Sequence, residues 1–442
     1  MMKKIIFFLL IICIISCNSN HKQKIIEINS KKIIDSTMQV FIDQEHYPFI
    51  YTRLENENGK VLYENSVKNN RILKNKEING STWIRIWSMS KIVTICIALD
   101  IMEDGLISLD DPVSKYIPEF ENLKVALKTD STSLVNNNWN EKVTNGNEPC
   151  PVVQVSNDSI MTIRHLLDHK AGFYYSTMSR ISWTNSIACL DSVMISQNLC
   201  SAKDGDDLIN RLSLMPLMQH SGTYHFYGLN TTVLGLVAER ATGKSLAQLL
   251  TERVTKPMKI KGMRYDLPIG ENMLGRFTGK DSLIREAKPE ELNIFGLDLP
   301  DYDQSNKLYL GGEGMICTTD GYCDFLRMLL NNGELNGYRM LNPETIKDLT
   351  SPHTNIDNPY GYNGYNIWIC SDSLLHKGQG DKNLWIGGGY EGTHFWIDTS
   401  RKFVGAIMTQ MFDVYDKSYG YSKDGRIRGA IYKPWTGIDY KN

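Results

Sequence analysis

A serine and a lysine three positions apart, Ser88 and Lys91, form the first pattern in the sequence that can do chemistry. Residues three apart on a helix share one face, so this hydroxyl and this amine can meet. A serine hydroxyl is a weak nucleophile that needs a proton acceptor, and a lysine in a desolvated pocket can serve. The start of a helix adds a backbone amide and the positive end of the helix dipole, where negative charge would develop. In isolation the pattern is more typical of a serine N-cap beside an exposed lysine, so the surrounding sequence decides.

The surrounding sequence supplies six blocks in a fixed order. Together they resemble the serine β-lactamase and penicillin-binding-protein superfamily, and most of all its branch of class C β-lactamases, DD-peptidases and esterase-like members. The resemblance covers residues 31 to 435, and six ordered blocks are far more specific than any single one. The blocks are Trp87–Lys91, Leu109–Phe120, Met161–Gly172, Tyr227–Gly235, Gly311–Met315 and Gly387–Thr393.

By that resemblance, Ser88 is the acylated nucleophile, Lys91 is its proton partner, and Tyr227 carries a proton to the leaving group. A tyrosine acts as a base near neutral pH only when its pKa is lowered, and an adjacent lysine ammonium lowers it. The resemblance also makes the backbone amides of Ser88 and Tyr390 the two oxyanion donors. We therefore expect an acyl-enzyme on Ser88 that water hydrolyses, with no metal and no organic cofactor.

Two departures from the superfamily pattern bear on the substrate. The second motif often has Asn two residues after its Tyr, whereas this chain has Leu229 there and Asn230 one step later. The third motif usually begins with Lys, His or Trp, and the ungapped match places Gly387 at that point. We expect the substrate to lie along Gly387, Gly388 and Gly389, with Asn230 as a further contact. Both departures argue against an efficient β-lactamase, so esterase or DD-peptidase-like activity on a small ester, an amide or a D-amino-acid peptide is favoured over β-lactam hydrolysis.

A function of another class remains as the alternative. The same fold, anchored at a surface, can bind its ligand with weak turnover or none. Leu229 and Gly387 favour this reading, whereas the intact Ser88, Lys91 and Tyr227 oppose it. Metal chemistry has no support in the sequence, because no Cys or His cluster has the spacing of a zinc site. Structural or rim positions are expected for His165, His169, His225 and His394.

The elements that must position these residues are strands at both ends of the chain and helices between them. Extended runs at 49–53 and 61–63 flank the hairpin signal Asn58-Gly59, and β-rich runs return at 365–370, 392–398 and 403–411. From 88 to 104 apolar residues lie all round the helix, which predicts a buried central helix. The expected α+β fold is β-lactamase/transpeptidase-like: an antiparallel sheet formed from both chain ends, flanked by helices, with a helical insert region. Further helices are predicted over 34–42, 162–169, 231–242, 319–331 and 426–432.

The first residues are typical of an export signal. Two lysines precede an apolar run from Ile5 to Ile15, about 11 residues against the roughly 20 that a membrane-spanning helix needs. Ile14–Cys17 resembles a bacterial lipobox, in which Cys17 is lipidated and becomes the mature N-terminus. The predicted organisation is a signal peptide over 1–16, a lipidated tether over 17–30 and a serine hydrolase domain over 31–442. The protein is then exported and held in the cell envelope by its lipid.

The composition is that of a folded globular protein. Hydrophobic residues make up 42% and charged residues 22% of the chain, which excludes disordered and low-complexity classes. Lysine and arginine total 48 against 50 acidic residues, a formal charge of -2 that does not attract nucleic acid. The expected partners are a small-molecule or peptide substrate and, through the lipid, a membrane. We expect the cysteines after Cys17 to be mostly buried thiols, although Cys189 and Cys200 are spaced to close a short loop.

Overall fold

The computed structural model describes residues 30–135, 152–175, 188–279, 283–288, 291, 302–353, 361–370 and 384–411. The predicted signal peptide and Cys17, nearly all of the tether, Cys150 and the helix predicted over 426–432 lie outside these residues. Among the described residues, no helix combines the length and the apolar character needed to cross a bilayer.

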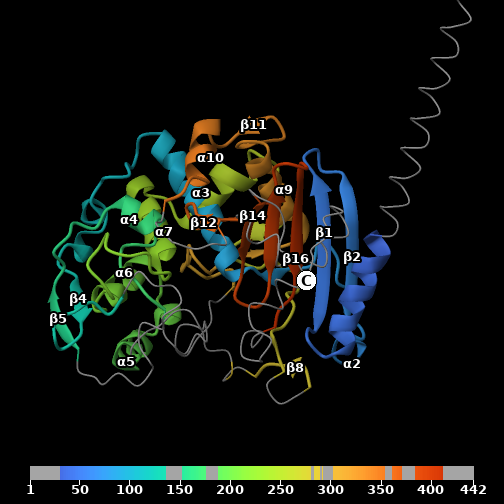
Figure 1. Cartoon of the computed structure of the whole chain (residues 1–442), viewed down its shortest axis with the longest axis horizontal. Coiled ribbons are helices and arrows are strands. Elements are labelled where there is room, and N and C mark those ends of the chain that lie inside the picture. The colour runs from blue at the N-terminus through green and yellow to red at the C-terminus, as the bar shows by residue number, and fades with distance from the viewer. Residues whose placement is uncertain are drawn as a thin grey trace, which may run out of the picture.

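One antiparallel sheet joins the two ends of the chain. β1 lies between β2 and β16, with Phe49 opposite Lys68 and Tyr51 opposite Met408. This confirms the expected α+β fold with a sheet formed from both chain ends (Figure 1). The strands follow one another across the sheet in the order β12 (Gly361–Asn363), β13 (Trp368–Cys370), β14 (Leu384–Gly388), β15 (His394–Asp398), β16 (Phe403–Met408), β1 (Phe49–Asn56) and β2 (Val61–Lys68).

The turn between β1 and β2 confirms the hairpin signal. The Asn56 side-chain oxygen accepts hydrogen bonds from the amides of Asn58 at 3.1 Å and Lys60 at 2.9 Å. Gly59 has a φ of +80°, a left-handed conformation that glycine adopts without the steric penalty of a side chain. Local turn chemistry therefore sets the register of the first two strands.

Helices cover both faces of this sheet. Arg53 of β1 points to one face, where it lies 3.2 Å from Asp320 of α9 (Thr319–Leu330). The next residue points to the opposite face, as does its cross-strand partner Tyr63, which donates a hydrogen bond of 2.6 Å to Asp35. Asp35 belongs to the N-terminal helix over 30–43, which lies beside β2 in Figure 1.

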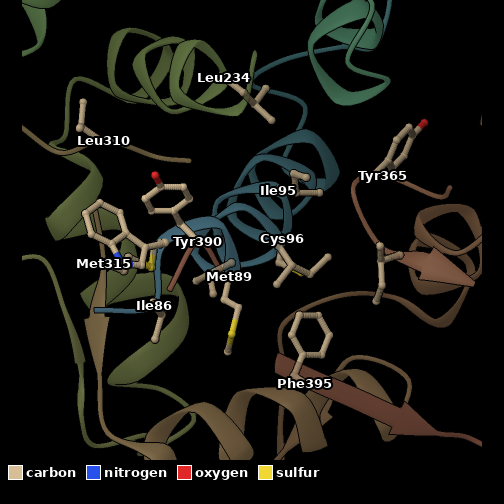
Figure 2. Packing of buried hydrophobic residues seen from close by; sticks show 14 of the residues in the cluster. Ile86, Met89, Ile95, Cys96, Leu234, Leu310, Met315, Tyr365, Tyr390 and Phe395 are labelled. Carbon is tan, nitrogen blue, oxygen red and sulfur yellow. The ribbon is translucent and has the colours of Figure 1, made fainter. Parts of the chain in front are cut away.

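The central helix α3 (Ser90–Glu103) is buried on all sides, as its apolar composition predicts. It lies between α7 (Asn230–Thr242) and the sheet, and Figure 2 shows Ile95 and Cys96 of α3 between Leu234 of α7 and Phe395 of β15. Because α3 is buried on all sides, its first turn is packed within the core.

Four of the five other helices predicted from the sequence lie within the described residues, and the structure has a helix at each place: the helix over 30–43, α4, α7 and α9. The helical region is present as α4 to α8, and the helix predicted over 319–331 is α9. Cys96, Cys317 and Cys323 are buried thiols, as expected. Other helices are α2 (Asn70–Leu73), α4 (Ile163–Leu167), α5 (Ala188–Gln197), α6 (Gly205–Ser213), α8 (Leu246–Leu249), a π-helical turn over Leu250–Thr255 and α10 (Pro343–Leu349). Within the described ranges, short strands form four small sheets: β3 (Ile84–Arg85), β9 (Ile316–Cys317) and β6 (Met263–Arg264); β4 (Lys124–Leu127) and β5 (Val153–Ser156); β7 (Phe277–Thr278) and β8 (Arg285–Glu286); β10 (Glu334–Leu335) and β11 (Tyr338–Arg339).

Candidate active site

Ser88 lies in a short 3-10 turn, Trp87–Met89, that leads directly into α3. Trp87 has a φ of 46°, an uncommon conformation for a bulky residue, and its side chain is fully buried. Its ring packs edge-on against Tyr390, with centroids 6.1 Å apart, and the Arg276 guanidinium lies 5.1 Å above it. Packing thus holds a strained backbone just before Ser88, as is common at functional sites.

The structure brings together the three residues for which the sequence predicts catalytic roles. The Tyr227 hydroxyl lies 2.7 Å from Ser88 Oγ, and Lys91 Nζ lies 3.3 Å from the same oxygen. Ser88 and Lys91 share the first turn leading into α3, whereas Tyr227 comes from the loop before α7. Both neighbours are therefore in place to exchange a proton with Ser88, and the tyrosine is the closer of the two.

Lys91 is completely buried among oxygen acceptors. Its Nζ contacts the Tyr175 hydroxyl at 2.8 Å, the Gly312 carbonyl at 2.9 Å and Glu313 Oε1 at 2.9 Å. Burial by itself lowers the pKa of Lys91, but the Glu313 carboxylate and Tyr227 act in the opposite direction, and the net pKa is raised. Lys91 is therefore an ammonium at neutral pH.

Three residues around Lys91 have no role assigned from the sequence. Tyr175 donates a short hydrogen bond to Glu313 Oε1, and Thr232 donates one to Glu313 Oε2. A Cβ on Gly312 would lie 2.9 Å from Thr232 Oγ1 and 3.1 Å from Lys91 Nζ, which explains the glycine there. The sequence does draw attention to Glu313, because it is the one charged residue in the glycine-rich block Gly311–Met315. Nothing in the sequence draws attention to Tyr175, one of 22 tyrosines.

The glycine segment of the third motif runs along the end of β14. Gly387 pairs with Phe395, and a Cβ on Gly387 would lie 2.3 Å from the Phe395 ring, so this position admits no side chain. A Cβ on Gly389 would lie 2.4 Å from the Ile86 carbonyl oxygen, so the strand end directly contacts the segment that leads to Ser88. Gly388 pairs with His394. The segment can thus offer a substrate its backbone but no charged side chain at Gly387.

The backbone pattern at the end of β14 bears on the second oxyanion donor. The Gly389 amide donates to the Thr393 carbonyl at 2.8 Å, on the side of β15, and the Gly392 amide closes the turn on the Gly389 carbonyl at 3.1 Å. Tyr390 therefore lies inside the turn that links β14 to β15. With its ring on Trp87, Tyr390 stands next to the residue before Ser88.

Asn230 does not lie where the sequence pattern predicts a substrate contact. It is the first residue of α7 and fully buried, and its amide nitrogen lies 3.3 Å from the Phe226 carbonyl and 3.2 Å from His169 Nδ1. His169 in turn stacks on the Tyr227 ring, with centroids 5.1 Å apart and planes 11° from parallel. Burial, reinforced by the charges of His225 and Lys91, places the pKa of His169 well below its usual value. A neutral, structural His169 therefore supports Tyr227, and Asn230 supports His169.

A buried ion pair links the two backbone segments beside Ser88. Arg276 and Glu391 are both buried and paired with each other. Arg276 covers the ring of Trp87, which precedes Ser88, and Glu391 directly follows Tyr390. Nothing in the sequence indicates this pairing, because 115 positions separate its members.

The described residues show no metal centre. Nowhere in those ranges do three His, Cys, Asp or Glu side chains gather in a way that would hold a metal ion.

The sequence model of the beta-lactamase family matches residues 55–418. The chain belongs to the beta-lactamase family. Monacolin J acid methylbutanoyltransferase from Aspergillus terreus is 26% identical over 271 residues, which cover 61% of this chain and 56% of that protein. Esterase EstB from Burkholderia gladioli is 26% identical over 213 residues, which cover 47% of this chain and 43% of the esterase.

Solved structures share the architecture. EstCE1, a hydrolase with promiscuous acyltransferase activity, is similar with a TM-score of 0.70 at 18% identity, over 92% of this chain and 100% of EstCE1. This likeness confirms the expected β-lactamase/transpeptidase-like fold. The family match and the curated relatives place the chain among the serine hydrolases and acyl-transferring enzymes.

Proposed function

We propose that this protein is a serine hydrolase that acts through an acyl-enzyme on Ser88 and cleaves small esters or amides. The observation that carries the proposal is the arrangement at the start of α3. Ser88 Oγ lies 2.7 Å from the Tyr227 hydroxyl and next to the buried ammonium of Lys91. A nucleophile, a proton carrier and a fixed positive charge are the parts that acyl transfer requires.

In the proposed reaction Tyr227 acts as a phenolate: it takes the proton from Ser88 as Ser88 Oγ attacks the carbonyl carbon, and it becomes a neutral phenol. The Lys91 ammonium lies 5.1 Å from the Tyr227 ring and stabilises negative charge on the phenol oxygen. The amides of Ser88 and Tyr390 would hold the oxyanion of the tetrahedral intermediate. Tyr227 then gives its proton to the leaving group, which departs as an alcohol or amine. Water attacks the acyl-enzyme in the same way, with Tyr227 as the base, and releases the acid and Ser88.

The site favours an acyl group without a carboxylate near the third motif. Gly387 has the Phe395 ring where its side chain would be, and Asn230 is buried against His169. Neither can bind a charged group of the substrate. We therefore propose small esters and neutral amides as substrates ahead of D-amino-acid peptides, and β-lactams as the poorest of the three classes.

Transfer of the acyl group to an alcohol is a second candidate function. An acyl-enzyme on Ser88 reacts with whichever hydroxyl reaches it, so hydrolysis and transfer share their first half. Two relatives carry a transferase activity in their names, the methylbutanoyltransferase and EstCE1. Product analysis with a short-chain alcohol added to an ester substrate separates the two outcomes.

Acylation of Ser88 is tested with a fluorophosphonate probe read by intact mass, together with a p-nitrophenyl ester, a D-alanyl-D-alanine peptide and a chromogenic cephalosporin. Labelling should be stoichiometric in the wild type and absent in Ser88→Ala. Ser90→Ala is the matched control, because Ser90 lies two residues away and its Oγ accepts a hydrogen bond from the Met315 amide. A wild-type protein that takes no label and turns over no ester would instead be the weakly active or inactive binding protein.

We further propose that the protein is an exported lipoprotein anchored through Cys17. The support is the order of a basic start, a short apolar run and a cysteine in Ile14–Cys17. Cys17→Ser should leave the leader uncleaved or release the protein from the membrane fraction. An unchanged mature mass together with unchanged fractionation would contradict the anchor.

A further inference from the structure

A buried carboxylate lies next to the site, and the proposed reaction does not use it. Glu313 is 2% exposed and sits in the segment between Tyr309 and β9, remote in sequence from Ser88. One oxygen contacts Lys91 Nζ at 2.9 Å and receives the Tyr175 hydroxyl, and the other receives Thr232. A buried carboxylate is costly unless it is paired and fully hydrogen-bonded, and here it is both.

The hydrogen bonds around Lys91 can be accounted for one by one. The Gly312 carbonyl and the Glu313 carboxylate only accept, and Tyr175 directs its hydrogen at Glu313 and so presents its oxygen to Lys91. These three contacts, at 2.8 to 2.9 Å, match in number the three hydrogens of an ammonium. Ser88 Oγ, at 3.3 Å, is the longest contact of Lys91. A neutral amine, with two hydrogens and a lone pair, would leave one of the three acceptors unsatisfied.

From this geometry we propose that Glu313 is a positioning residue: its carboxylate holds Lys91 as an ammonium, which has no lone pair to accept the Ser88 proton and so leaves that proton to Tyr227. The proposal rests on the proposed function in one respect, the acyl-enzyme on Ser88. Beyond that function, it assigns the choice of base to a residue that touches neither the substrate nor Ser88.

The buried ammonium of Lys91 needs an acidic partner, and Glu313 is that partner. Leu229, which stands two residues after Tyr227, is a buried apolar side chain and offers Lys91 no polar group. The polar partner of Lys91 comes instead from the glycine-rich segment that holds Glu313. An uncompensated ammonium at a fully buried position would be strongly destabilising, so the carboxylate supports both the fold and the reaction.

The groups that face this pair come from four segments. Lys91 faces Ser88 in its own turn, Tyr175 and Tyr227 from two loops, and Glu313. His169 lies behind the Tyr227 ring and is neutral, because burial holds its pKa well below the usual value. Thr232 of α7 contacts only the far oxygen of Glu313 and the Gly312 amide. Glu313 is thus the one acidic side chain in direct contact with Lys91 among the described residues.

The direction of the expected effect follows from the charges. Glu313 raises the pKa of Lys91, so Glu313→Gln should lower it. Once Lys91 loses its proton, the charge that stabilises a Tyr227 anion is gone and acylation slows. The falling alkaline limb of kcat/KM should therefore move to lower pH by about one unit or more, and kcat/KM at neutral pH should fall roughly tenfold or more. KM should change little, because Glu313 does not touch the substrate.

The experiment measures ester turnover and the rate of fluorophosphonate labelling from pH 5 to 10 in wild type and four variants. In Glu313→Gln the alkaline limb of kcat/KM should move to lower pH. In Glu313→Asp, which keeps the charge, the limb should lie closer to its wild-type position. Thr232→Val removes a hydrogen bond to Glu313 but no charge, so its limb should stay in place. Glu239→Gln is the matched control, because Glu239 is a half-buried acid of α7 that accepts a hydrogen bond from the Leu246 amide, away from Lys91.

The outcomes separate this proposal from the proposed function. A folded Glu313→Gln whose label still reaches Ser88 and whose pH profile matches the wild type would overturn the role of Glu313 alone. A wild type that takes no label at Ser88 would overturn the proposed function, and this proposal with it. Should Glu313→Gln fail to fold, the wild-type profile decides. Activity that holds to about pH 9 or above supports an ammonium at Lys91, and an alkaline limb with its midpoint below about pH 9 overturns it.

Discussion

The buried ion pair between Arg276 and Glu391 permits a quantitative prediction about stability. Glu391→Gln removes one charge and leaves the Arg276 guanidinium buried, with side chains 1% and 0% exposed in the intact pair. Breaking such a pair from one side costs about 3–5 kcal/mol, because the remaining charge stays out of water without its partner. Removing both charges, in Arg276→Met/Glu391→Leu, should be far milder, since an apolar pair of similar size has no charge to desolvate.

The expected change in melting temperature follows from the size of the domain. The unfolding entropy is about 2 cal/mol/K per residue, or about 0.8 kcal/mol/K for roughly 400 residues, so Glu391→Gln should lower Tm by about 4–6 °C. The double variant should lie within about 2 °C of the wild type. Glu334→Gln is the control: its partner Arg339 is 40% exposed, and surface pairs contribute about 0–1 kcal/mol.

Calorimetry of the four proteins at one pH and salt concentration checks the stability prediction, and ester turnover at 25 °C adds a functional readout. Because Arg276 covers Trp87 and Glu391 follows Tyr390, Glu391→Gln should also lower kcat in the folded protein, by up to about a hundredfold for a displacement near 1 Å. A Tm as high as that of Glu334→Gln would refute the reasoning, as would a double variant that loses as much stability as the single one.

Three further predictions concern the sheet, the half-buried acid Glu239 and the proposed catalytic group. Deleting all residues after 390 removes β15 and β16, and with β16 the partner of β1, so cooperative melting should be lost; a truncated chain that still melts cooperatively would contradict the shared sheet. Burial raises the pKa of Glu239 to about 7 from 4.5, so the folded state binds the extra proton and stability should fall by about 3 kcal/mol as pH rises from 4.5 to 7; melts across this range should show the fall in wild type and not in Glu239→Gln. Lys91→Ala and Tyr227→Phe should each slow ester turnover by about a hundredfold or more, and the double variant should be little slower than the worse single one. If the rate loss of the double variant equals the product of the losses in Lys91→Ala and Tyr227→Phe, the two residues act independently and the prediction is wrong.

Much of the architecture could be predicted from the sequence because it depends on local periodicity. Apolar residues all round 88–104 predict a buried helix, and α3 is that helix. Asn58-Gly59 predicts a hairpin turn, and its side-chain and backbone contacts are those of a turn. The position of Ser88 at a helix start follows from the same local pattern, because residues three apart along a helix must share a face.

The sequence pattern is less informative where a single step along the chain changes the direction of a side chain. Asn230 stands one position beyond the place where the superfamily pattern often has Asn. Successive helix positions differ by about 100°, so a step of one position changes which neighbours a side chain meets, and Asn230 contacts His169. Gly387 matches the third motif by count, but only the pairing of β14 with β15 reveals that the Phe395 ring occupies the space of the missing side chain.

The sequence by itself determined the position of Ser88 at the start of a buried helix and the sheet that joins the chain ends, because each depends on residues close together or on ordered blocks along the chain. Only the tertiary structure decided the environment that sets their chemistry. Tyr175 and Glu313 reach Lys91 across 84 and 222 positions, and Arg276 reaches Glu391 across 115. No periodicity relates residues so far apart. Their meeting is a consequence of how α3, α7 and the sheet pack, and burial in that packing is what gives the charges their effect.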